Sequence, residues 1–106
     1  MLTNLNDTCI PGGTLQQNGS GKFKDYTYEL LSDIKSLGVN AIWYTGVLEM
    51  ATKTDFSAYG IEKDNPHVVK GEAGSPYAIK DYYDVDPALA VNVDKRLEEY
   101  DALVKR

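Results

Sequence analysis

The chain is poor in the side chains that most often carry chemistry. Its 106 residues include one cysteine and one histidine. Cys9 has no second cysteine for an internal disulfide and precedes the turn-forming Pro11-Gly12-Gly13, so an inert thiol is expected. His67 has no visible co-ligands for zinc and no nucleophile to activate, so an exposed loop histidine is expected. The sequence therefore predicts neither zinc chemistry nor a histidine-activated nucleophile.

Positive charge and long apolar runs are also scarce. Eleven Lys and Arg stand against sixteen Asp and Glu, which gives a net charge of −5. No basic stripe is available to displace counterions from phosphates, so neither nucleic acid nor an anionic membrane surface is an expected partner. No stretch approaches the roughly 20 apolar residues of a membrane span, and residues 1–6 lack the pattern of a secretory signal. The compartment stays open.

The composition is that of one small domain with a modest core. Residues 1–24 are rich in Asn, Thr, Gly, Ser and Gln and contain the turn signal Asn18-Gly19-Ser20-Gly21, so they are expected to form a loop. A disordered linker explains this composition equally well.

A helix followed by a strand is predicted over residues 25–44. Asp25 is the expected N-cap, apolar residues recur at helical spacing as far as Leu37, and Gly38 supplies the left-handed position that ends many helices. Val39–Tyr44 is then typical of a short buried strand. Helix, glycine and strand in this order indicate an α/β fold with a parallel sheet.

The rest of the chain is predicted to be one long loop and one helix. Residues 45–91 show little periodicity and are interrupted repeatedly by Gly and Pro. A loop of this length is uncommon and usually functional, and on a β/α barrel it lies where active sites are built. Residues 92–106 form an amphipathic pattern with Asn92 as the N-cap and Asp94 in the first turn, which predicts a helix.

Four segments resemble the α-amylase family, glycoside hydrolase family 13, in that family's order. Lys35 through Trp43 contains Leu-Gly-Val-Asn-Ala-Ile-Trp, which is similar to the family's junction between its first helix and second strand. Gly74-Ser75-Pro76 followed by Tyr77 through Pro87 resembles the step from Gly-x-x-Tyr into Asp-Tyr-x-x-Val-x-Pro. Gly21 through Asp25, followed by Leu30 through Ile34, resembles the family's entry into its first barrel helix. Asp94 through Val104 resembles the helix before the family's third strand. The first junction occurs in many barrels, but its combination with the second segment is specific.

The resemblance implies that residues 1–106 are a single segment of a (β/α)8 TIM barrel. It covers about four fifths of the chain and places residues 1–24 after a missing first strand. The family's nucleophilic Asp, its acid/base Glu and its third Asp lie on later strands, so no catalytic residue is expected here. A barrel needs about 250 residues, so the chain alone is expected to be inactive. The intact enzyme would be a retaining glycosidase of α-linked glucans such as maltooligosaccharides.

Three residues are candidates for substrate binding. By resemblance, Tyr77 stacks on the sugar just before the scissile bond, and a fixed ring suits the apolar face of a pyranose; otherwise it packs its loop. Asp81 either organises the loop or contacts sugar. Trp43, at the rim end of the expected strand, lines the pocket or fills the core. Thr45-Gly46-Val47 follows where the family often has Pro, so the next loop departs from the family pattern.

The remaining oxygen ligands are expected to be structural. Retaining glycosidases hold two carboxyl groups about 5–5.5 Å apart across the bond. Asp84 and Asp86, close together ahead of Pro87, are instead expected to cap a helix.

No cofactor is expected. Calcium is the one metal with candidate ligands, the alternating oxygen atoms of Asn4, Asn6 and Asp7, which lack the full ligand set of an EF-hand.

Two other functions fit the sequence. A non-catalytic carbohydrate-binding or scaffold domain derived from the same barrel would use the eight tyrosines for stacking. A small α/β interaction domain would be a stable monomer that ignores sugars. One strand and two amphipathic helices cannot close a parallel sheet, so the chain is expected to self-associate by pairing strands between copies.

Overall fold

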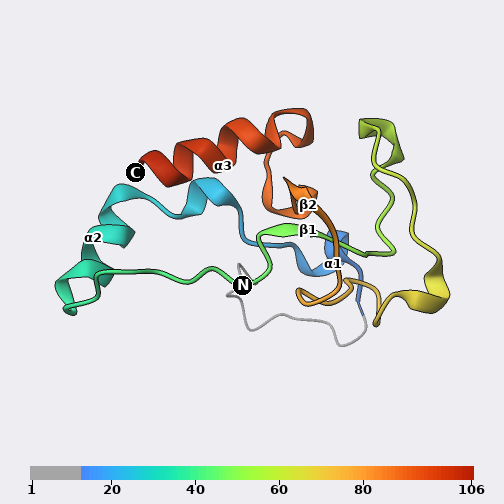
Figure 1. Cartoon of the computed structure of the whole chain (residues 1–106), viewed down its shortest axis with the longest axis horizontal. Helices are drawn as coiled ribbons and strands as arrows, with labels where there is room; N and C mark the ends of the chain where they lie inside the picture. Colours follow the sequence, from blue (N-terminus) through green and yellow to red (C-terminus); the bar gives the residue numbers. More distant parts are fainter. Residues whose placement is uncertain (1–12) are drawn as a thin grey trace.

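The computed structural model describes residues 13–106 and shows an elongated molecule, 43 × 31 × 22 Å. Figure 1 shows α2 at one end, α3 along one side, and a long excursion between the two strands at the other end. The helices and strands are α1 (Leu15–Asn18), α2 (Tyr28–Ser36), β1 (Leu48–Met50), β2 (Ile79–Val85) and α3 (Arg96–Lys105). Five 3-10 turns join them: η1 (Phe23–Asp25), η2 (Ser57–Tyr59), η3 (Pro66–Val68), η4 (Pro87–Leu89) and η5 (Val93–Lys95).

The helix α2 begins three residues later than the sequence pattern predicts. Its N-cap is Thr27, whose hydroxyl accepts a hydrogen bond from the Leu30 N–H at 3.2 Å. The predicted cap, Asp25, is wrong: it belongs to η1, where its carboxylate accepts from the Lys22 N–H at 2.8 Å. The fully buried Phe23 holds η1 against the core, so the chain must turn before α2 can start. Gly38, with φ of 89°, follows the helix as expected.

The C-terminal helix is reached through its predicted cap. The Asn92 side chain accepts from the Asp94 N–H at 3.1 Å and starts η5, from which α3 continues. Glu99, on the first turns of α3, reaches back and accepts from the N–H groups of Val91 and Asn92 at 2.8 and 2.7 Å. Side-chain oxygens of Asn92 and Glu99 therefore accept from the backbone N–H groups of residues 91, 92 and 94, and these hydrogen bonds tie the residues before α3 to the helix.

Within residues 13–106 the only sheet is two-stranded and antiparallel, and it lies inside the stretch predicted as a loop. Its register is irregular, because the partner of Leu48 is Val85 while the partner of Glu49 is Asp81. The residues between Asp81 and Val85 form a bulge. A three-residue strand and a bulged one produce no sustained alternation, which explains why the sequence pattern missed both.

The strand predicted at Val39–Tyr44 is not formed. These residues run as an extended trace from α2 toward β1 (Figure 1) and make no hydrogen bond within residues 13–106. A strand needs a neighbour to take up its N–H and C=O groups, and none lies beside this segment. The chain then bends at Thr45 and Gly46, where Gly46 has φ of 81°. The expected parallel sheet is therefore absent from the described part, and the partial barrel remains a prediction.

The core lies where α3, η1 and the end of β2 meet. Four buried side chains form it: Phe23, Val85, Leu89 and Leu103. The rings of Phe23 and Tyr100 pack with centroids 5.7 Å apart. The Arg106 guanidinium donates to the carbonyl oxygens of Phe23 and Tyr26, both at 2.7 Å, and so ties the end of the chain to η1. The excursion between the strands lies outside this core.

Candidate functional site

Tyr77 lies on a turn that is fixed mainly by its backbone. The Ala78 N–H donates to the Ser75 carbonyl at 3.0 Å, and the Tyr77 N–H donates to the Ser75 hydroxyl at 3.3 Å. Gly74 precedes this turn with φ of 82°, and a Cβ there would stand 2.0 Å from the Ala51 carbonyl oxygen. Only glycine allows that approach. The phenol side chain itself is 84% exposed, so a rigid turn presents a free aromatic ring.

A shallow hollow of about 440 Å³ lies beside this ring. Its lining consists mostly of small side chains and backbone. The lining residues are Gly13, Lys70, Gly71, Glu72, Ala73, Gly74, Ser75, Pro76 and Tyr77. The volume is in the range of small-ligand sites. Lys70 and Glu72 bring one donor and one acceptor group, and the Tyr77 ring brings an apolar face. An aromatic face with a few polar groups at its edge is the kind of surface that a sugar ring requires.

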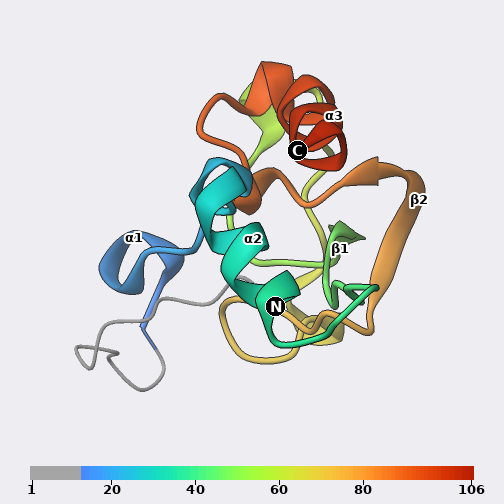
Figure 2. The same ribbon diagram turned by 90° about the vertical axis from the view of Figure 1, so that its left-hand side faces the viewer.

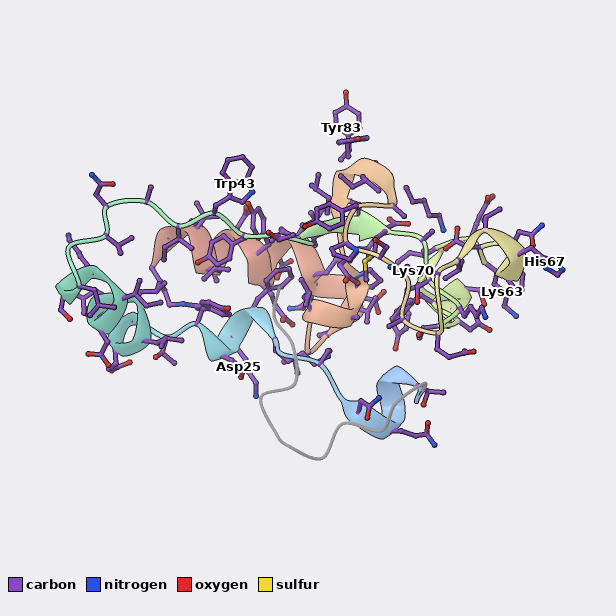
Figure 3. All side chains as sticks on the ribbon, turned by 90° about the horizontal axis from the view of Figure 1, so that it is seen from below. Asp25, Trp43, Lys63, His67, Lys70 and Tyr83 are labelled. Carbon is purple, nitrogen blue, oxygen red and sulfur yellow. The ribbon has the colours of Figure 1, made fainter. Side chains whose placement is uncertain are left out.

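The other two substrate-binding candidates lie elsewhere. Asp81 is on β2, and its carboxylate accepts from the Tyr83 N–H at 2.7 Å, which stabilises the bulge. Trp43 lies on the unpaired segment after α2 and is 93% exposed. Figure 3 shows its ring pointing away from the ribbon, so the alternative of a core tryptophan is wrong. Neither residue lines the hollow beside Tyr77.

A partly buried ionic cluster centred on Lys80 holds the excursion against the sheet. The Lys80 Nζ lies 3.1 Å from Asp64 Oδ1 and 3.6 Å from Glu49 Oε1, and it donates to the Glu62 carbonyl. Asp64 also accepts from the Thr52 N–H at 3.0 Å. Glu49 is only 5% exposed, and burial raises the pKa of its carboxyl, an effect that Lys80 partly offsets. No local spacing in the sequence links these residues, so sequence reasoning missed the cluster.

Asp84 and Asp86 have separate structural partners. Asp84 forms a two-pronged ion pair with Arg96 of α3, with Nε to Oδ1 at 2.8 Å, and hydrogen bonding from that guanidinium lowers the Asp84 pKa. Asp86 caps η4 by accepting from the Ala88 N–H at 2.9 Å, as expected for an acid ahead of Pro87. Burial raises the Asp86 pKa to about 6. The Asp84 carboxylate therefore binds Arg96 of α3, and the Asp86 carboxylate binds the backbone of η4.

Within residues 13–106 no group of three or more His, Cys, Asp and Glu side chains could hold a metal ion. Cys9 and the calcium candidates Asn4, Asn6 and Asp7 lie outside the described residues. His67 is exposed, as expected, at the excursion end of the molecule (Figure 3). No helix in the described part is long and apolar enough to cross a bilayer.

No protein-family model, curated protein or solved structure matches the chain. The residues themselves are therefore the basis of the functional assignment.

Proposed function

We propose that the chain is an early segment of the catalytic barrel of an α-amylase-family glycoside hydrolase that acts on α-linked glucans. The observation that carries the proposal is Tyr77. Its ring is 84% exposed on a fixed turn, and it stands in the segment, Gly74 through Pro87, whose order of residues resembles that family. A preset ring loses little conformational entropy when a pyranose stacks on it, which favours binding.

In the intact enzyme this chain would contribute a wall of the glucan site. The chemistry would be a double displacement, in which an Asp nucleophile forms a glycosyl-enzyme and a Glu acts first as acid and then as base. By the resemblance, both lie on later strands. The Lys80 cluster and the Ala51 N–H to Ala78 carbonyl hydrogen bond at 3.0 Å hold the ends of the excursion beside the Tyr77 turn. These contacts support a sugar-binding surface that exists before substrate arrives.

A non-catalytic carbohydrate-binding domain from the same barrel is the second candidate. The observation in its favour is that Tyr77 is not the only exposed aromatic: Tyr82 is 69%, Trp43 93% and Tyr83 95% exposed. Exposed rings can stack on sugars without any catalytic partner. This reading predicts that several rings share the binding.

The two candidates are separated by binding with matched tyrosine variants. Maltoheptaose is titrated into the 106-residue chain and followed by calorimetry and by NMR shifts. We expect saturable binding that Tyr77→Ala weakens about tenfold, the effect of losing one aromatic stacking contact. The control Tyr83→Ala removes a still more exposed ring and is expected to leave the affinity unchanged. We expect no release of maltose by any form.

Each outcome has a consequence. Equal losses in the Tyr77 and Tyr83 variants would favour the non-catalytic binding domain. An absence of saturable binding at 10 mM ligand (about 2.7 kcal/mol of affinity) would reject a glucan site on this chain. Maltose release lost in Tyr77→Ala would show chemistry that the proposal places elsewhere.

A further inference from the structure

A second, smaller hollow adjoins the one beside Tyr77. It has a volume of about 170 Å³ and is lined by Thr14, Lys53, Thr54, Asp55 and Glu72. Glu72 lines both hollows, and Gly13, which lines the larger one, is the chain neighbour of Thr14. The two hollows therefore lie side by side. Figure 2 shows α1, which follows Thr14, on the opposite side of the molecule from β2.

Contacts between the two arms of the excursion hold the lining of the second hollow in place. The Lys53 N–H donates to the Glu72 carbonyl at 3.3 Å, and the Lys53 Nζ lies 3.5 Å from Glu72 Oε1. The Thr54 N–H donates to the Thr52 hydroxyl at 3.1 Å. The polar groups of this hollow thus have set positions before a ligand arrives, which lowers the entropy that binding costs.

The charges of the lining cancel. Across both hollows the charged side chains are two lysines, Lys53 and Lys70, and two acids, Asp55 and Glu72. Hydrogen bonds from Ser57 lower the pKa of Asp55 to about 2, so this acid is ionised at neutral pH. A charged ligand would meet as much repulsion as attraction here, whereas a neutral ligand rich in hydroxyl groups meets both donors and acceptors.

Two groups of the lining have hydrogen-bonding capacity to spare. Within residues 13–106 neither the Thr54 hydroxyl nor the Lys70 ammonium has a hydrogen-bond partner. A hydroxyl both donates and accepts and an ammonium donates, so each can bind a sugar hydroxyl. Lys70 lines the hollow beside Tyr77 and Thr54 lines the second one, so each hollow has one such group.

We propose that the second hollow binds the sugar unit next to the one that stacks on Tyr77, through hydrogen bonds to its hydroxyl groups. This inference rests on the proposed function and deepens it: the site takes two adjoining units of a neutral glucan, one by stacking and one by hydrogen bonding. Lys53, Thr54, Asp55 and Glu72 lie outside the four segments that resemble the glycosidase family, so the resemblance does not imply this second site.

NMR titration with glucose, a single unit, and with maltotriose tests the proposal. We expect both sugars to shift the signals of the Tyr77 turn and only maltotriose to shift the amides of residues 53–55. Thr54→Val removes the hydroxyl at nearly constant volume. It is expected to weaken maltotriose binding about fivefold, the effect of one lost hydrogen bond, and to leave glucose binding unchanged.

The matched control is Ser32→Ala, which removes an exposed hydroxyl from α2, at the other end of the molecule from the excursion (Figure 1). It should change neither affinity. Equal affinities for the two sugars, a Thr54→Val loss that is the same for both, or amides of residues 53–55 that ignore maltotriose would each overturn the second site while stacking on Tyr77 stands. If Tyr77→Ala left both affinities unchanged, the proposed function itself would be rejected, so the two failures are distinguishable.

Discussion

Among single residues, Asp86 is a buried carboxyl group whose ionisation opposes folding. It is 5% exposed, and its side chain accepts the cap hydrogen bond from the Ala88 N–H at 2.9 Å. Desolvation raises its pKa from 3.8 to about 6, although the nearby Lys22 acts in the opposite direction. Because the folded state holds this proton more tightly than the unfolded state, the contribution of Asp86 to stability falls as the pH rises from about 4 to about 6.

Replacement of Asp86 with Asn is expected to stabilise the protein at neutral pH. Asn keeps the oxygen that accepts from the Ala88 N–H and removes the buried charge. The gain in unfolding free energy over wild type should be near zero at pH 4 and reach about 2–3 kcal/mol at pH 7, the equivalent of about two pKa units. Urea denaturation at pH 4, 5, 6 and 7 measures the difference.

The neighbouring Asp84 is the control, because its pKa is lowered rather than raised. The stability that it contributes is present above the ordinary pKa of an aspartate and is lost as the pH falls through its lowered value. Asp84→Asn should therefore destabilise the protein at pH 7, opposite in sign to Asp86→Asn. Equal effects of the two variants would contradict this account of Asp86.

At the scale of elements, the helices could be predicted and the strands could not. Periodicity located α2 and α3 to within a few residues, because an amphipathic pattern, a cap and a terminal glycine are local properties. Val39–Tyr44 has the composition of a strand, yet strand formation depends on a partner that composition does not supply. The sheet that does form joins Leu48–Met50 to Ile79–Val85, and neither stretch alternates cleanly.

The turn before β2 depends on Gly74, so Gly74→Ala is expected to be strongly destabilising. A methyl group there would lie 2.0 Å from the Ala51 carbonyl oxygen, and the residue has φ of 82°. We expect a loss of at least 3 kcal/mol (about 1–2 from the left-handed backbone and the rest from displacing β1). Thermal denaturation measures it, and the NMR signals of Tyr77 should move with the turn.

Gly71 provides the matched control for that substitution. It also has a positive φ, 62°, but a Cβ there meets nothing within 4 Å. Gly71→Ala should therefore cost only the backbone strain, about 1–2 kcal/mol. If the two alanine variants melted at the same temperature, the close approach to Ala51 would have no energetic role.

At the scale of the whole molecule, the core is confined to the region where α3, η1 and the end of β2 meet. It is anchored by Phe23, the one large side chain that is fully buried within residues 13–106. Phe23→Ala is expected to destabilise the chain by about 3–5 kcal/mol. A small domain is stable by only about 5–15 kcal/mol, so this loss approaches global unfolding. Tyr83→Ala, at a side chain that is 95% exposed, should change stability by less than about 0.5 kcal/mol. Urea titration of both variants decides the comparison.

The sequence could predict the candidate site only where the site depends on residues that are close together along the chain. The sequence places Tyr77 in a loop interrupted by Gly74 and Pro76, and Tyr77 does lie on a turn and is exposed. The Lys80 cluster depends on the folding of a long excursion back onto the sheet, so its partners Glu49 and Asp64 were invisible to sequence spacing. Long-range ion pairs follow from topology, and the topology here was not the expected one.

The neck of the excursion makes its length nearly independent of the rest of the molecule. Ala51 and Ala78 are joined by a hydrogen bond of 3.0 Å, so the chain leaves the sheet and returns at almost the same point. The entropy of closing such a loop grows only with the logarithm of its length, about 0.6 kcal/mol for each doubling. Segments distal to the Lys80 cluster, around His67, can therefore be shortened, lengthened or exchanged for foreign sequence while the core around Phe23 is left undisturbed. The molecule contains a natural grafting position.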